Sequence, residues 1–135
     1  IAANMALPMT LSIDPVPEDV QRRVEQLAGE AGLPIARLTA AASTLSAEER
    51  VRVHLARALA SDPLVLLLEH PTAGVDEVAA DALGATLKQV SEARGVAFIA
   101  LTEDDRFARA TGGTRLRLRP ATGELVKETF WRLWR

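Results

Sequence analysis

The sequence has 135 residues, which is enough for one domain with a hydrophobic core but small for two. Hydrophobic residues make up 48% and charged residues 25%, a balance typical of folded globular proteins rather than disordered ones. A net charge of −2 argues against a nucleic-acid partner, and the lack of cysteine excludes disulfides and thiolate chemistry. No apolar run is long enough to span a bilayer and no secretion signal opens the sequence, so we expect a cytoplasmic protein.

The first half of the sequence predicts two helices. Residues 17–31 begin with a proline suited to the first turn of a helix, and Gly32 suits the position just after the last turn. Ser46 and Glu49 have the spacing of a capping box, in which each side chain bonds the other residue's backbone amide at a helix start. We therefore expect a second helix to begin at Ser46 and to continue to about residue 60.

The second half predicts a strand, a helix, a second strand and then a hairpin. Residues 64–68 and 96–101 are short apolar runs, the pattern of strands buried on both faces of a sheet. A helix over about residues 76–93 separates them, so the two strands are expected to be parallel. We expect a short helix at residues 104–110. The alternating arginines and leucines that begin residues 115–126 predict a half-buried strand and a hairpin.

The central part of the chain carries two motifs in register with each other. The first is Leu45-Ser46-Ala47-Glu48-Glu49-Arg50 at the start of the second predicted helix. The second is Glu69-His70-Pro71-Thr72, which follows an apolar run and leads to Asp76. In order and spacing, without a gap, they resemble the signature and Walker B motifs of the ABC ATPases. Thr102-Glu103-Asp104 likewise resembles the H-loop of that family. The resemblance extends over nearly the whole chain.

The resemblance implies an α/β fold that contains part of a P-loop NTPase (RecA-like) core. In the family's terms, residues 1–62 or so would form a helical subdomain with the signature helix. Residues 63–135 or so would form the Walker B, D-loop and H-loop part of the core, with parallel strands and a closing β-hairpin. The Walker A part is absent, since the pattern G-x-x-x-x-G-K-[ST] occurs nowhere in the sequence.

The resemblance also implies cofactors and partners. ATP and Mg²⁺ are the cofactors of the family, although this chain without a Walker A loop is expected to bind them poorly. The implied partners are a second ABC ATPase domain, which forms a dimer with the first, and membrane-spanning transporter subunits. Through those subunits the protein would lie at the inner face of a membrane.

The nucleotide-facing positions of the family are altered in this chain. Ser46, Ala47, Glu48 and Glu49 at the helix start would face the nucleotide together with Asp76. Where the family has two glycines after the serine, this chain has Ala47 and Glu48, and the charge of Glu48 is expected to weaken phosphate binding. The alternative is that Ser46, Glu49 and Asp76 only cap their helices.

The positions that hold metal and catalyse hydrolysis in the family are also changed. Glu69 replaces the aspartate that holds magnesium, so a carboxylate is kept on a longer side chain. His70 replaces the glutamate that polarises the attacking water, and Glu103 replaces the H-loop histidine. One interpretation is a functional exchange, with a hydrogen bond between His70 and Glu103 at neighbouring strand ends. The alternatives are an ion pair without catalytic function, or a His70 that bonds nearby backbone.

These changes lead to two hypotheses on function. The first is the C-terminal part of an ATP-binding subunit from an ABC-type membrane transporter, with impaired or absent hydrolysis. The alternative is a non-enzymatic interaction module derived from an ABC ATPase. In the family the Walker A strand lies beside the strand predicted at residues 96–101. Without it that strand has an open apolar edge, so we expect the chain to be part of a longer polypeptide or to pair with another.

Two further groups of residues each allow two interpretations. Arg115, Arg117 and Arg119 lie on one face of the predicted strand, which is either solvated or in contact with an anion or a partner. The C-terminal cluster of Phe130, Trp131, Leu133 and Trp134 either packs on its own domain or forms an interface.

Overall fold

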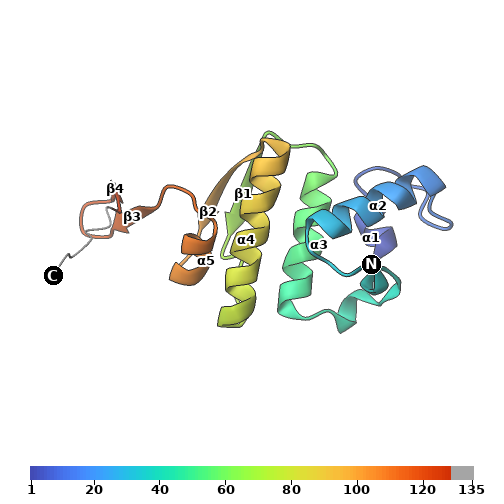
Figure 1. Ribbon diagram of the computed structural model, residues 1–135, viewed down its shortest axis with the longest axis horizontal. Helices are drawn as coiled ribbons and strands as arrows, with labels where there is room; N and C mark the ends of the chain where they lie inside the picture. The colour runs from blue at the N-terminus through green and yellow to red at the C-terminus, as the bar shows by residue number, and fades with distance from the viewer. Residues whose placement is uncertain (129–135) are drawn as a thin grey trace.

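The computed structural model describes residues 1–128, which form a helical part, an α/β part and a β-hairpin in chain order (Figure 1). The helical part contains α1 (Ala2–Ala6), α2 (Glu18–Glu30), η1 (Ile35–Thr39), η2 (Ala42–Thr44) and α3 (Ala47–Leu59). The α/β part contains β1 (Val65–Glu69), α4 (Glu77–Arg94), β2 (Ala97–Leu101) and α5 (Asp105–Ala110). The hairpin pairs β3 (Leu116–Arg119) with β4 (Glu124–Lys127). None of the helices in residues 1–128 is both long and apolar enough to pass through a membrane.

The helix ends follow the local chemistry that the sequence predicts. Ser46 and Glu49 form both hydrogen bonds of a capping box at the start of α3. The side chain of Asp76 accepts hydrogen bonds from two amides in the first turn of α4, and Gly95 ends that helix with a φ of 65°. Gly32 follows α2 with a φ of 70°. The three long helices therefore begin and end close to the predicted residues.

The two strands of the α/β part are parallel, as predicted, but only one face of their sheet is covered. Leu66 points to the covered face, where it is 5% exposed and packs into the core with side chains of α4 and α5. On the other face Leu67, Ile99 and Leu101 are 78%, 59% and 61% exposed. The prediction of strands buried on both faces is wrong, because the helices described here lie against one face only.

The hairpin is antiparallel, as predicted, but it is not half-buried. Leu116 and Leu118 of β3 are 55% and 57% exposed, because no element within the described residues covers them. The arginines alternate with these leucines and lie in ion pairs on the other side of the strand. Arg117 contacts Glu128, and Arg119 lies 3.9 Å from Glu124. These pairs favour a solvated arginine face. The predicted C-terminal aromatic cluster lies outside the described residues.

Buried apolar side chains join the helical and α/β parts in one core. The largest of them are Met5, Leu27, Leu33 and Leu59 from the helical part, and Leu87 and Phe107 from the α/β part. The candidate site lies where these two parts meet.

Candidate functional site

The carboxyl ends of β1 and β2 lie side by side and bring the candidate catalytic residues to one edge of the sheet. Glu69 is opposite Leu101 in the parallel register. The backbone N–H of His70 then donates a hydrogen bond to the carbonyl of Leu101 at 2.8 Å. The edge beyond the carboxyl ends of parallel strands is where open α/β folds bind ligands. The ends of β1 and β2 are thus close together, as expected.

His70 occupies an unusual backbone conformation at the end of β1. Its φ is 44°, in the left-handed region that non-glycine residues rarely adopt. The conformation starts the turn that leads to α4, in which the N–H of Ala73 donates to the carbonyl of His70 at 3.0 Å. Strained backbone of this kind is frequently found at functional sites, where surrounding structure holds it.

The predicted hydrogen bond between His70 and Glu103 is not formed in the described structure. Both side chains are exposed, and neither has a side-chain hydrogen bond or ion pair to the other. Glu103 lies beyond the end of β2, so the parallel register does not place it directly opposite His70. The ion pair considered as an alternative is equally absent. What holds His70 in place is its backbone bond to Leu101.

The first turn of α3 is held by a polar network on one side. Glu49 accepts a hydrogen bond from the backbone N–H of Ser46 at 2.9 Å, and its own N–H donates to the Ser46 hydroxyl at 3.1 Å. Arg37 of η1 adds an ion pair to Glu49 at 2.7 Å. The pKa of Glu49 is lowered, first by the hydrogen bond from the Ser46 backbone and also by Arg37. Ser46 and Glu49 therefore cap the helix.

Glu48, in the same first turn of α3, does not present a free negative charge. Its carboxylate accepts hydrogen bonds from Nε and Nη2 of Arg52 at 2.9 and 2.7 Å. Arg52 is only 7% exposed, and its Nη1 also donates to the carbonyl of Ala31 and to the hydroxyl of Thr86. The charge of Glu48 is therefore paired with a buried guanidinium. The spacing of Glu48 and Arg52, four residues apart on one helix, was the sequence signal for this pair.

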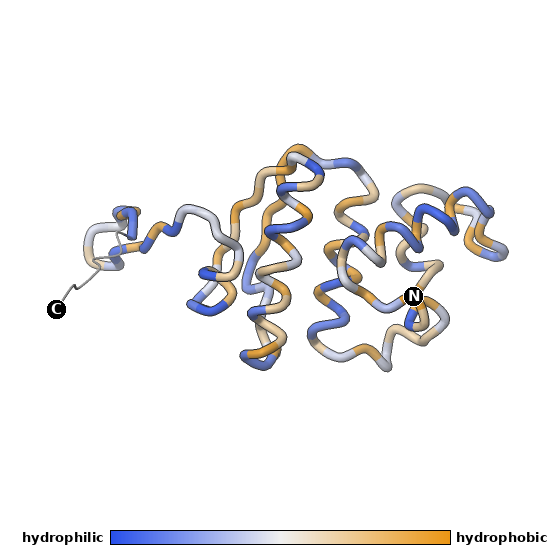
Figure 2. Tube along the Cα trace, in the orientation of Figure 1, coloured by the Kyte–Doolittle hydropathy of each residue, from blue (hydrophilic) through white to orange (hydrophobic). Residues whose placement is uncertain are grey.

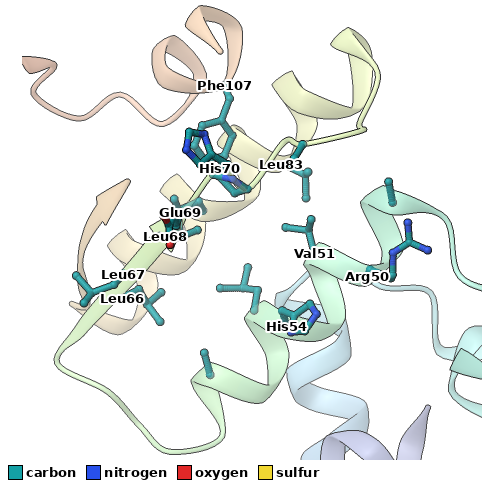
Figure 3. A pocket seen from close by; sticks show the side chains of 16 residues that line it. Arg50, Val51, His54, Leu66, Leu67, Leu68, Glu69, His70, Leu83 and Phe107 are labelled. Atoms are coloured by element: carbon teal, nitrogen blue, oxygen red, sulfur yellow. The ribbon is translucent and has the colours of Figure 1, made fainter. Parts of the chain in front are cut away.

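An open groove with a volume of about 490 Å³ separates α3 from β1. Figure 3 shows Val51 and His54 on the α3 side and Leu66 to His70 on the β1 side. Leu83 of α4 and Phe107 of α5 also line the groove. Of the predicted site residues, Ala47, Glu69 and His70 line this groove. The other predicted site residues do not line it: Ser46, Glu48, Glu49, Asp76 and Glu103. His54, which the sequence analysis did not select, is a second histidine in the lining of the groove.

Glu69 fits magnesium as one ligand but not as a complete site. No group of three acidic, histidine or cysteine side chains within residues 1–128 could hold a metal ion. Magnesium is commonly bound by one or two protein carboxylates together with nucleotide phosphates and water. Glu69, exposed at the strand end, can supply one such carboxylate. The sequence offers no glycine-rich phosphate loop to complete the site.

Comparisons with known proteins point to one family. The chain matches no protein-family model. It is 36% identical over 105 residues to the lipoprotein-releasing system ATP-binding protein LolD of Alcanivorax borkumensis, covering 78% of this chain and 45% of that protein. It is 35% identical over 106 residues to the methionine import ATP-binding protein MetN of Legionella pneumophila, covering 75% of this chain and 29% of that protein.

The fold resembles solved structures of the same kind. A dimeric structure of MJ0796, described as a bacterial ABC transporter cassette, matches with a TM-score of 0.65 and 27% identity. The match covers 81% of this chain and 48% of the cassette. A second structure of MJ0796, bound to ADP and Pi, matches with a TM-score of 0.61. The chain therefore spans about half the length, or less, of the proteins that it matches.

Proposed function

Because the chain belongs to the ABC ATP-binding proteins and spans about half of a member's length, we propose that it is the C-terminal part of an ATP-binding subunit from an ABC-type transporter. We further propose that ATP hydrolysis by this subunit is impaired or absent. The observation that carries the second statement is His70, which stands at the end of β1 with its side chain exposed and without a partner carboxylate.

The nucleotide would lie beyond the carboxyl end of the sheet and the first turn of α3. Glu69 would contribute a carboxylate to nucleotide-bound magnesium, and Asp76 would face the partner domain while it caps α4. Ser46 would offer its hydroxyl to phosphate from the capped start of α3, since helix starts attract anions. The triphosphate itself would be held by a phosphate loop that this chain does not contain.

Two replacements would slow the chemical step. A glutamate that polarises water is an anionic acceptor at neutral pH, whereas the imidazole of His70 carries no negative charge and differs in reach. At the second position Glu103 would place a carboxylate near the γ-phosphate, where a like charge is repelled. Since the two residues are not bonded to each other, neither compensates for the other's change of charge.

The uncovered face of the β1–β2 sheet supports the proposal that another half completes the domain. Leu67, Ile99 and Leu101 leave an apolar face open, and a sheet of two strands has two free edges. We propose that the phosphate-binding half covers this surface, from the same polypeptide or from another. The complete domain would pair with a second ABC ATPase domain and attach to membrane-spanning subunits at the inner face of a membrane.

A chimera tests the proposal. The phosphate-binding half of the LolD relative is placed before Ile1, and Mg-ATP binding and phosphate release are measured for this chimera and for the 135-residue chain alone. We expect no saturable binding to the chain alone and clear binding to the chimera. Phosphate release should be slow, and His70→Glu with Glu103→His should accelerate it by about 100-fold or more, the contribution of a positioned general base.

A matched control and two contrary results make the test decisive. His54→Glu places a glutamate on the other wall of the groove and should not accelerate phosphate release. If the unsubstituted chimera hydrolyses ATP as fast as the doubly substituted one, the proposed impairment is wrong. If neither chimera binds Mg-ATP, the alternative of a non-enzymatic interaction module is favoured.

A further inference from the structure

Arg52 ties the first turn of α3 to two other helices. Its guanidinium is buried, and Nε and Nη2 both donate to one carboxylate oxygen of Glu48, at 2.9 and 2.7 Å. Nη1 donates to the carbonyl of Ala31 at 2.9 Å and to the hydroxyl of Thr86 at 3.1 Å. Ala31 ends α2, and Thr86 lies within α4. One side chain therefore joins the start of α3 to the end of α2 and to α4.

The surrounding residues are suited to hold this guanidinium. Gly32 follows α2 with a φ of 70°, and a Cβ on it would lie 2.3 Å from Nη1 of Arg52. The hydroxyl of Thr86 donates its hydrogen to the carbonyl of Ala82 at 2.9 Å, which leaves a lone pair of its oxygen for Arg52. A lysine could not reproduce these contacts, because its ammonium is a single point charge, whereas the guanidinium is a planar fork of donors.

Two hydrogen bonds join α3 to α4 within residues 1–128. The first is the bond from Arg52 to Thr86, and the second runs from Arg94 to the carbonyl of Leu59 at the C-terminal ends of both helices. Figure 1 shows that α3 and α4 lie side by side and begin at the same end of the molecule. The start of α3 at this end is hydrophilic, as the blue colour in Figure 2 shows. The bond made by Arg52 is therefore the one nearer to the first turn of α3.

We propose that Arg52 is a positioning residue, which sets where the first turn of α3 stands relative to α4. The inference rests on the proposed function, in which Ser46 offers its hydroxyl to phosphate from this turn. With a rise of about 1.5 Å per residue, Ser46 lies about 20 Å from Leu59 along the helix. A tilt of about 5° about Leu59 would move Ser46 by about 2 Å, whereas a hydroxyl bonds an oxygen over a range of only about 0.5 Å.

Loss of the bond between Arg52 and Thr86 should therefore weaken nucleotide binding without unfolding the chain. The bond from Arg94 to Leu59 and the apolar core remain when this bond is removed. Helix α3 then stays attached at its far end, while its first turn loses a fixed position. A residue with a purely structural role would lower the melting temperature but would leave the affinity of the folded protein unchanged.

The chimera with the phosphate-binding half of the LolD relative tests the proposal. The dissociation constant of Mg-ATP is measured well below the unfolding temperature. Thr86→Val keeps the shape of the side chain but removes the acceptor, and we expect the dissociation constant to rise several-fold. Thr86→Ser keeps the hydroxyl and should restore the native value. Arg52→Lys should raise the constant by about tenfold or more, because it disturbs all three contacts. The matched control is Thr39→Val, whose exposed hydroxyl bonds only the carbonyl of Ala36, and it should change nothing.

The possible results separate this inference from the proposed function. Native dissociation constants for Thr86→Val and Arg52→Lys, in a chimera that binds Mg-ATP, would overturn the positioning role, and so would equal rises for Thr86→Val and Thr86→Ser. A chimera without Mg-ATP binding would contradict the proposed function instead. Hydrogen exchange of the 135-residue chain needs no nucleotide and then decides the inference. Thr86→Val should speed exchange several-fold at the amides of residues 47–50 but not in α5, and unchanged exchange there would overturn the inference.

Discussion

Replacing Arg94 with methionine is expected to weaken the boundary between the helical and α/β parts. The guanidinium hydrogen-bonds Glu30 of α2, Asp62 at 3.0 Å and the backbone carbonyl of Leu59 at 3.2 Å. The side chains of Arg94 and Glu30 are 18% and 28% exposed, whereas that of Asp62 is 73% exposed. Arg94→Met keeps much of the aliphatic contact but leaves a shielded carboxylate without its cation.

The magnitude follows from how far each contact is shielded. A hydrogen bond to a charged group contributes about 1.5–3 kcal/mol, while an exposed ion pair contributes less than about 1 kcal/mol. With one shielded and one exposed carboxylate, we expect the free energy of unfolding to fall by about 2 kcal/mol. For a chain of this length, that corresponds to a fall in Tm of about 7 °C.

The pH dependence of this loss has a definite sign. The pKa of Glu30 lies below its ordinary value of 4.5, chiefly because Arg94 donates a hydrogen bond to it. A lowered carboxyl pKa stabilises the fold above the pKa of the unfolded chain, and this stabilisation is lost as pH falls through the folded-state pKa. The difference between the native sequence and Arg94→Met should therefore be full at neutral pH and shrink below about pH 4.5.

Thermal unfolding followed by far-UV circular dichroism at low micromolar concentration measures both effects. The matched control is Lys88→Met on the same helix, where the ammonium lies 4.0 Å from Glu92 and both side chains are at least half exposed. We expect the control to lose less than about 0.5 kcal/mol. Equal losses for Arg94→Met and Lys88→Met, or a loss for Arg94→Met that does not change in acid, would refute this account of the boundary.

Three further predictions address other parts of the fold. Gly32→Ala should lower the free energy of unfolding by more than Gly95→Ala. Both residues have a positive φ, but only at Gly32 would a Cβ lie 2.3 Å from a buried guanidinium. Similar losses for the two variants in urea titrations would contradict this prediction. Ser46→Ala should cost about 1 kcal/mol, since it removes the cap of α3, and unchanged stability in the same titration would show that the capping box contributes nothing. Leu67→Lys with Ile99→Lys should reduce self-association of the chain in sedimentation experiments, because the two lysines place charge on the uncovered sheet face. Association that persists unchanged would show that copies of the chain contact each other through another surface.

The parts of the fold that are determined by residues close to one another in the sequence could be predicted from it. The start of α3 was predictable because Ser46 and Glu49 satisfy each other's amides within one turn, and the end of α4 because Gly95 accepts a left-handed conformation. The exposure of Leu67 was not predictable. Apolar runs indicate that a strand is built to be buried, but not whether the segment that buries it lies in the same stretch of chain.

The closeness of the ends of β1 and β2 was predictable, but the contacts between the candidate residues were not. The register of β1 and β2 brings the end of β1 beside β2, as expected for parallel strands. It does not bring the side chains of His70 and Glu103 together, because one follows its strand directly in a strained turn and the other lies further along an exposed loop. Spacing along a sequence cannot specify such differences of a few ångströms, which decide whether two groups share a proton.

The start of α3 shows how a contact made in three dimensions changes an electrostatic argument. Judged by sequence, Glu48 adds a charge that repels phosphate. In the structure that charge is paired with Arg52, which is itself fixed by the carbonyl of Ala31 and the hydroxyl of Thr86, residues that are distant in sequence. Because Arg52 neutralises the charge of Glu48, the replacement of the family's two glycines is the larger change at this turn. Ala47 and Glu48 both carry a Cβ where two glycines would let a phosphate approach the backbone. We therefore propose that steric restriction at the turn, more than repulsion, would separate this helix start from an efficient phosphate site.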